Sequence, residues 1–146
     1  VMKVIGDAER IGDYSVDIAR TAITLAEQEF FKPLVDIPRM AELVRGMLRH
    51  AIEALVQRDL DLVRTVIDDD DSVDNMWYFL LDELQGIMQK RPEVVVQATA
   101  LLLVARYLER IADHTVNIAE RVAYMETGEL RTLAPSHGSD LESERG

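Results

Sequence analysis

The eleven residues 9–19, ERIGDYSVDIA, recur as residues 109–119, ERIADHTVNIA, and seven of the eleven positions are identical. The second copy starts 100 residues after the first, which is too long for one solenoid repeat and close to the length of a duplicated three-helix bundle. Each copy contains Glu-x-x-x-Asp, which on a helix places two carboxylates one turn apart on one face. The repeat therefore predicts two related helices, each with an acidic pair that could contribute to a cation site.

The composition indicates a soluble helical protein. Of the 146 residues, 48% are hydrophobic and 29% are charged, and only seven glycines and four prolines interrupt them. The chain has no cysteine, which excludes disulfides, thiolate metal sites and cysteine nucleophiles, and which is compatible with a cytoplasmic protein.

The charge of the chain limits its partners. The net charge is −11 and there is no basic run, so binding to nucleic acid or to free phosphate is not expected. Cations are the small ligands that this charge favours. The longest apolar run, residues 98–105, is far shorter than the roughly 20 residues of a membrane span, so direct membrane insertion is not expected either.

Four helices are predicted, over about residues 4–31, 38–57, 60–90 and 92–127. Pro33 and Pro38 bracket a short linker, because proline disfavours helix at its own position and at the one before. Asp59 is a suitable N-cap for the third helix and Gly128 a suitable C-cap for the fourth. We expect residues 1–32 to be one helix, residues 38–128 to be a self-contained three-helix bundle, and residues 129–146 to be a disordered tail.

The core of this bundle is predicted from the apolar stripes of its helices. Its expected members are Leu48, Trp77, Leu84, Leu101, Leu108 and Ile111. On the fourth helix, at about 100° per residue, Glu109, Asp113 and Asn117 fall roughly 120° to 200° from the centre of the stripe. We therefore expect these three side chains, and any metal that they bind, to lie on the outer surface of the bundle.

Two acidic pairs are predicted to meet between the third and fourth helices. Asp70 and Asp113 lie at equal distances along the chain from the tight turn at residues 91–92, and so do Asp74 and Glu109. In two antiparallel helices such residues lie at the same height. Asp70 also falls on the apolar stripe of its helix, where a carboxylate must be paired, protonated or bound to metal.

The simplest alternative for these four carboxylates is a solvated charged face with Arg106 and Arg110 as salt-bridge partners. The metal interpretation rests on the predicted equal heights, on Asp70, and on four consecutive aspartates at residues 68–71. Oxygen-only ligands favour hard cations such as Mg²⁺, Mn²⁺, Ca²⁺ or Fe³⁺. His114 is a possible further ligand, but it is expected to be a partly exposed helix histidine.

The two repeated motifs, together with the acidic stretch from Asp70 to Asp74, resemble the PhoU family of regulators of bacterial phosphate uptake. The resemblance covers about residues 1–128. Family members are tandem three-helix bundles, and their acidic motifs hold metal clusters. The resemblance therefore implies a metal site formed by Asp70, Asp74, Glu109, Asp113 and Asn117, with one or several ions of iron, manganese, magnesium or zinc.

The resemblance also implies a regulatory role through contacts with a phosphate ABC transporter and a sensor histidine kinase. The protein is then expected in the cytoplasm, or at the inner face of the membrane through its partners. The chain departs from the family pattern because its first repeat contributes only its last helix. Glu9 and Asp13 would form a second metal site, but the helices that would complete that site are not in this sequence.

Two other functions remain open from the sequence: a metal-dependent helical-bundle enzyme and a plain structural bundle. No catalytic motif is recognisable, and an enzyme is not expected. The helix over residues 1–31 carries an apolar face that the missing helices would have covered. We therefore expect a homodimer or a higher assembly that buries Ile11, Ile18, Ala22 and Leu25.

Overall fold

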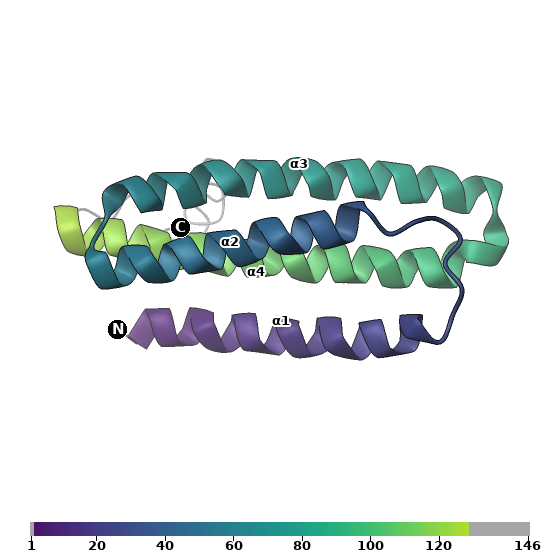
Figure 1. Ribbon diagram of the computed structural model, residues 1–146, viewed down its shortest axis with the longest axis horizontal. Coiled ribbons are helices and arrows are strands. Elements are labelled where there is room, and N and C mark those ends of the chain that lie inside the picture. Colours follow the sequence, from purple (N-terminus) through teal and green to yellow (C-terminus); the bar gives the residue numbers. More distant parts are fainter. Residues whose placement is uncertain (1, 129–146) are drawn as a thin grey trace, which may run out of the picture.

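The computed structural model describes residues 2–128, and within them the regular structure is helical throughout (Figure 1). The elements are α1 (Met2–Ala26), α2 (Asp36–Gln57), α3 (Leu60–Lys90), the 3₁₀ turn η1 (Pro92–Val94) and α4 (Val95–Thr127). The all-α prediction is confirmed. The predicted disordered tail, residues 129–146, lies outside the described residues.

The first helix is shorter than the sequence indicated. It ends at Ala26 instead of continuing to about Phe31. The side chain of Gln97 on α4 explains the difference, because it binds the polar groups of the segment that follows. It accepts a hydrogen bond from the backbone N–H of Phe31 (3.0 Å) and donates to the carbonyl oxygen of Glu29 (3.0 Å). These bonds stabilise an extended linker that a local pattern does not predict.

The connection between α2 and α3 follows the sequence prediction. Arg58 adopts a left-handed conformation with φ of 56°, which ends α2. Asp59 then caps α3, since its carboxylate accepts hydrogen bonds from the backbone N–H groups of Asp61 (2.8 Å) and Leu62 (3.3 Å). A cap of this kind satisfies amides at the start of the helix that have no intrahelical partner.

The two ends of α4 are also as expected. Its chain enters through η1, where Pro92 occupies the first turn. It leaves at Gly128, which has φ of 70° and donates its backbone N–H to the carbonyl of Tyr124 at 2.8 Å. Glycine adopts this left-handed conformation without the steric cost of a Cβ atom.

The central helix of the molecule is α4. It packs against α1, α2 and α3, whereas α1 packs against α4 and no other helix among the described residues. Figure 1 shows α1 along one edge of the molecule and α3 along the opposite edge. Small side chains allow this close approach: four alanines spaced seven residues apart on α4 are fully buried, namely Ala98, Ala105, Ala112 and Ala119.

The predicted core is largely confirmed. Leu84, Leu101, Leu108 and Ile111 are buried. Trp77 and Leu48 are only partly buried and pack against the edge of the core. The guanidinium of Arg106 lies over the Trp77 ring, 5.6 Å from its centroid, so this ring separates the core from a charged surface.

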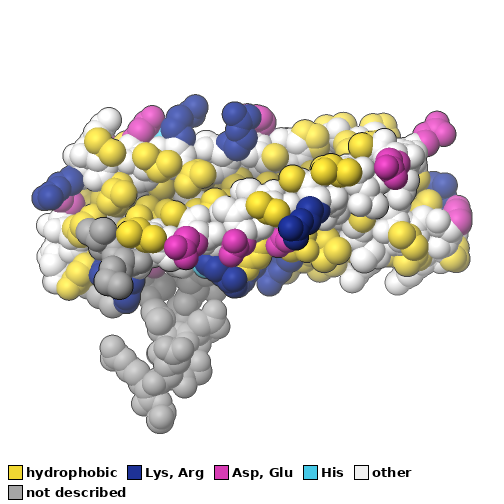
Figure 2. All heavy atoms as spheres, turned by 90° about the horizontal axis from the view of Figure 1, so that it is seen from below, with side chains coloured by type: hydrophobic (Ala, Val, Ile, Leu, Met, Phe, Trp, Pro, Cys, Tyr) yellow, Lys and Arg dark blue, Asp and Glu magenta, His cyan; other side chains and the backbone are white. Residues whose placement is uncertain are grey.

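One face of α1 is buried within the chain. Ile11 and Leu25 are buried in the same core as α4, which corrects the expectation that another subunit must cover them. Other apolar positions of α1 remain open: Ile5, Val16 and Ile23 are exposed. Figure 2, which views the molecule from the side of α1, shows many hydrophobic side chains among scattered charged ones. Among residues 2–128, no helix combines the length and the apolar character of a membrane span.

Candidate metal centre

Three carboxylates from two helices come together between α3 and α4. Asp70 and Asp74 project from α3 and Asp113 from α4, and a carboxylate oxygen of each lies within 4.8 Å of the others. The turn at Arg91 fixes the register of the two helices, as the sequence predicted. We refer to Asp70, Asp74 and Asp113 as the acidic cluster.

Asp70 is the most deeply placed member of the acidic cluster. Its residue has no exposed surface, and it lies on the same face of α3 as the buried Val66 and Val73. Removing a carboxylate from water is costly unless protonation, pairing or a cation compensates its charge. A position of this kind is unusual for a residue that only solvates a helix surface.

Glu109 lies one helical turn before Asp113 and is also buried, with only 11% of its side chain exposed. The side chain of Asp113 is 14% exposed. The prediction that these residues lie on the outer surface of the bundle is therefore wrong. It assumed one buried stripe on α4, whereas contacts with three helices leave little of this helix open to solvent.

The electrostatic environment of Glu109 is unfavourable for its charged form. Burial, together with the neighbouring negative charge of Asp113, raises the pKa of Glu109 from 4.5 to about 7. Arg106 and Arg110 act in the opposite direction and lower this pKa. The net result of these opposing effects is a pKa well above the ordinary value of 4.5.

Arg106 and Arg110, the salt-bridge partners expected for a solvated charged face, both form ion pairs. Arg106 pairs with Glu109 through its Nη1 atom, and Nη1 of Arg110 lies 3.5 Å from Oδ2 of Asp113. The guanidinium of Arg110 also donates to the hydroxyl of Tyr14 on α1, at 3.5 Å. The salt bridges and the acidic cluster therefore coexist, and neither excludes the other.

Asn117 makes a hydrogen bond to α1. It is exposed, and its Nδ2 atom donates to Oδ1 of Asp7 on α1 at 3.2 Å. Its role as a metal ligand stays a prediction. The same Asp7 oxygen lies 2.8 Å from Nδ1 of His114, which is partly exposed as expected.

Asp7 was missed by the sequence analysis, although a signal was available. It lies one helical turn before Ile11, on the face of α1 that packs against α4. Polar residues on a packed face need partners, and His114 and Asn117 are the partners that α4 supplies.

The second predicted site is not assembled among the described residues. Glu9 and Asp13 are both exposed on α1, and neither belongs to a group of three potential ligands in residues 2–128. The predicted role of Glu9 and Asp13 as metal ligands stays untested.

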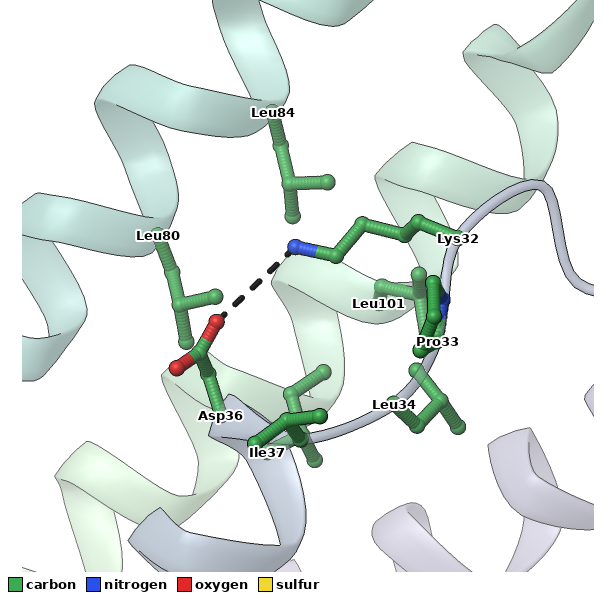
Figure 3. A pocket seen from close by; sticks show the side chains of 9 residues that line it. Lys32, Pro33, Leu34, Asp36, Ile37, Leu80, Leu84 and Leu101 are labelled. Atoms are coloured by element: carbon green, nitrogen blue, oxygen red, sulfur yellow. Dashed lines mark ion pairs between the residues drawn. The ribbon is translucent and has the colours of Figure 1, made fainter.

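A small hollow beneath the linker is a structural feature rather than a second binding site. Figure 3 shows Lys32 projecting across it toward Asp36, with Leu80 and Leu84 alongside. Its free volume is about 10 Å³, which is at most enough for one water molecule. Nζ of Lys32 lies 2.6 Å from Oε2 of Glu83, and this ion pair fastens the linker to α3.

Comparison with known proteins agrees with the fold and with the repeated motifs. The family model described as the PhoU domain matches residues 37–122. A phosphate-specific transport system accessory protein PhoU homolog from Clostridium acetobutylicum is 36% identical over 87% of this chain and 58% of its own length. The homolog of the same name from Aquifex aeolicus is 39% identical over 89% of this chain and 59% of its own length.

Solved structures show the same architecture. The crystal structure of PhoU from Pseudomonas aeruginosa matches with a TM-score of 0.83 and 35% identity, over 87% of this chain and 61% of that one. The phosphate transport system regulatory protein PhoU from Streptococcus pneumoniae matches with a TM-score of 0.80 and 29% identity, over 90% of this chain and 62% of that one.

These relatives are named as accessory or regulatory proteins and not as enzymes, in agreement with the expectation for this chain. The chain spans only about three fifths of the length of the curated relatives that it matches. The match of the family model, the identity and the shared fold together establish that the chain belongs to the PhoU family.

Proposed function

We propose that this protein regulates phosphate uptake and that its acidic cluster binds a hard metal cation. The regulatory role follows from relatives that are named as accessory proteins of the phosphate-specific transport system. The partners would be the phosphate transporter and a sensor histidine kinase, both reached from the cytoplasm. The observation that carries the metal proposal is the convergence of Asp70, Asp74 and Asp113 from two helices.

The donor set fits a hard cation. All three ligand groups are carboxylates, which suit magnesium, manganese, calcium or ferric iron better than soft metals. Asp70 and Asp74 lie one turn apart on a rigid helix, so their spacing is fixed before the metal binds. Glu109 is not one of these three groups; it lies one turn before Asp113 on α4 and pairs with Arg106, so its role as a further ligand stays a prediction.

A bound cation would act mainly on the contact between α3 and α4. Without it, three carboxylates repel one another across this contact. With it, the same groups hold the two helices together. Metal binding would therefore tune the stability of the bundle that presents surfaces to partner proteins.

Calorimetric titration with Mn²⁺ tests the metal proposal. We expect the wild-type protein to bind Mn²⁺ and the double variant Glu109→Gln, Asp113→Asn to lose that binding while its helicity is retained. A matched control, Glu42→Gln with Asp61→Asn, removes the same charge from exposed positions on α2 and α3. Equal Mn²⁺ stoichiometry in the wild type and in the Glu109 and Asp113 variant would refute the site and favour a plain structural bundle.

A further inference from the structure

Two adjacent aromatic side chains are exposed on α3. Tyr78 is 66% exposed and Phe79 is 59% exposed. The preceding Trp77 is different, since it packs against the core beneath Arg106. The contacts of α3 with α2 and α4 use the opposite side of the helix, so Tyr78 and Phe79 contribute nothing to the core of the bundle.

Acidic residues accompany these rings along the same outward stripe. At about 100° per residue, Asp68, Asp71 and Asp82 fall on the side of α3 that carries Tyr78 and Phe79, and all three are exposed. We refer to these five residues as the acidic aromatic face. Figure 1 shows α3 along the edge of the molecule that is farthest from α1.

No basic residue neutralises the acidic aromatic face from within its own helix. Residues 65–89 contain no Lys, Arg or His. Arg64, at the start of the helix, pairs with Asp61 at 3.1 Å. The negative potential of the face is therefore directed toward solvent, and it adds to a net charge of −11.

We propose that the acidic aromatic face docks onto a cationic loop on the cytoplasmic side of the phosphate transporter. This inference rests on the proposed regulatory function. Cytoplasmic loops of membrane proteins carry an excess of Lys and Arg. Such side chains pair with the carboxylates, and they also stack over the rings of Tyr78 and Phe79. Exposed aromatic residues are the side chains that most often dominate the energy of protein interfaces.

Charge excludes the two main alternative occupants of this face. Anionic lipid headgroups and nucleic acid would both be repelled by the carboxylates that surround the two rings. A cationic protein segment has the complementary charge, and it also has aliphatic stems that cover aromatic surface.

Surface plasmon resonance with the purified phosphate transporter of the same organism, reconstituted in nanodiscs, tests this docking. The double variant Tyr78→Ala, Phe79→Ala should bind about tenfold more weakly than the wild-type chain, or not at all. The matched control Ile52→Ala, Val56→Ala removes two exposed apolar side chains from α2 and should bind like the wild type. Circular dichroism confirms that each variant is folded.

A second double variant tests how much the carboxylates of the acidic aromatic face contribute to binding. Asp68→Asn with Asp82→Asn should weaken binding and reduce its dependence on salt, because screened ion pairs are removed. If the wild type binds and the Tyr78 and Phe79 variant binds within twofold of it, the docking face is wrong and the proposed function stands. If the wild type does not bind the transporter at all, the proposed function fails together with this inference.

Discussion

Asp7 on α1 and His114 on α4 form a pair that links the two helices, with Oδ1 and Nδ1 2.8 Å apart. His114 belongs to the second copy of the internal repeat, and Asp7 lies two residues before the first copy, so the pair connects the two repeated helices. Asn117 donates to the same carboxylate oxygen of Asp7. Since α1 packs against no other helix in the described part of the chain, these bonds bear directly on how firmly α1 is held.

Replacing Asp7 by alanine should therefore loosen α1. We expect a loss of about 1–2 kcal/mol in the local stability of residues 2–26, as for a partly buried hydrogen bond to a charged group. Hydrogen exchange measured by mass spectrometry reports this as faster exchange in α1 with unchanged protection in α3. Glu9→Ala is the matched control, since Glu9 is exposed on the same helix. Equal protection of α1 in Asp7→Ala and in the wild type would show that the pair is not needed.

Truncation of Leu108 tests which face of α4 is buried in the core. Its side chain is buried between the helices, and Leu108→Ala should lower the free energy of unfolding by about 2–5 kcal/mol. Leu103→Ala on the same helix is the control, because Leu103 is exposed and its truncation should have a small effect. Urea denaturation measures both. A loss below about 0.5 kcal/mol for Leu108→Ala would mean that the buried face of α4 is misassigned.

The raised pKa of Glu109 predicts a pH dependence of stability in metal-free protein. Burial and Asp113 raise this pKa from 4.5 to about 7 in the folded state, so folding favours the protonated carboxyl. The resulting contribution to stability is fully present below pH 4.5 and is lost as the pH rises through 7. Glu109→Gln should remove this dependence.

The measurement is urea denaturation of the wild type and of Glu109→Gln in chelator, at several values between pH 5 and pH 8. The variant should gain stability relative to the wild type as the pH rises, by an amount on the order of 2–3 kcal/mol. Parallel pH profiles for the two proteins would contradict the assigned environment of Glu109.

The exposed face of α1 predicts self-association. Val16 is 50% exposed and Ile23 is 69% exposed, whereas Val116, the equivalent of Val16 in the second repeat, is fully buried. An apolar face of this length in water favours a homodimer that covers it. The variant Val16→Glu, Ile23→Glu should shift the chain toward the monomer.

Light scattering at a protein concentration of tens of micromolar measures the oligomeric state. The expected mass of the wild type is about twice the 16.5 kDa of one chain. A wild-type mass of 16.5 kDa with α1 still helical would show that α4 alone is sufficient to hold α1.

Local signals in the sequence predicted the parts of the fold that depend on local contacts. Asp59 caps the start of α3 and Gly128 caps the end of α4, each through hydrogen bonds to residues within four positions. Their roles can therefore be recognised without the tertiary structure. The equal heights of Asp70 and Asp113 were also predictable, because a tight turn fixes the register of two antiparallel helices.

The features that the sequence did not predict depend on contacts between distant residues. The end of α1 is set by Gln97, which lies 66 residues from Phe31 in the chain. The burial of Glu109 and Asp113 depends on the central position of α4, which no periodicity within α4 reveals. The position of Asp7 one turn before Ile11 was a local signal, but its partners His114 and Asn117 lie on another helix, more than 100 residues away in the chain.

Anomalous X-ray diffraction from crystals grown with Mn²⁺ shows whether Asp70, Asp74 and Asp113 bind a hard cation. We expect an anomalous peak between α3 and α4, at coordination distance from carboxylate oxygens of these three residues. The peak should be absent in the Glu109→Gln, Asp113→Asn variant. A well-ordered acidic cluster without an anomalous peak, in crystals that contain Mn²⁺ at millimolar concentration, would contradict the account.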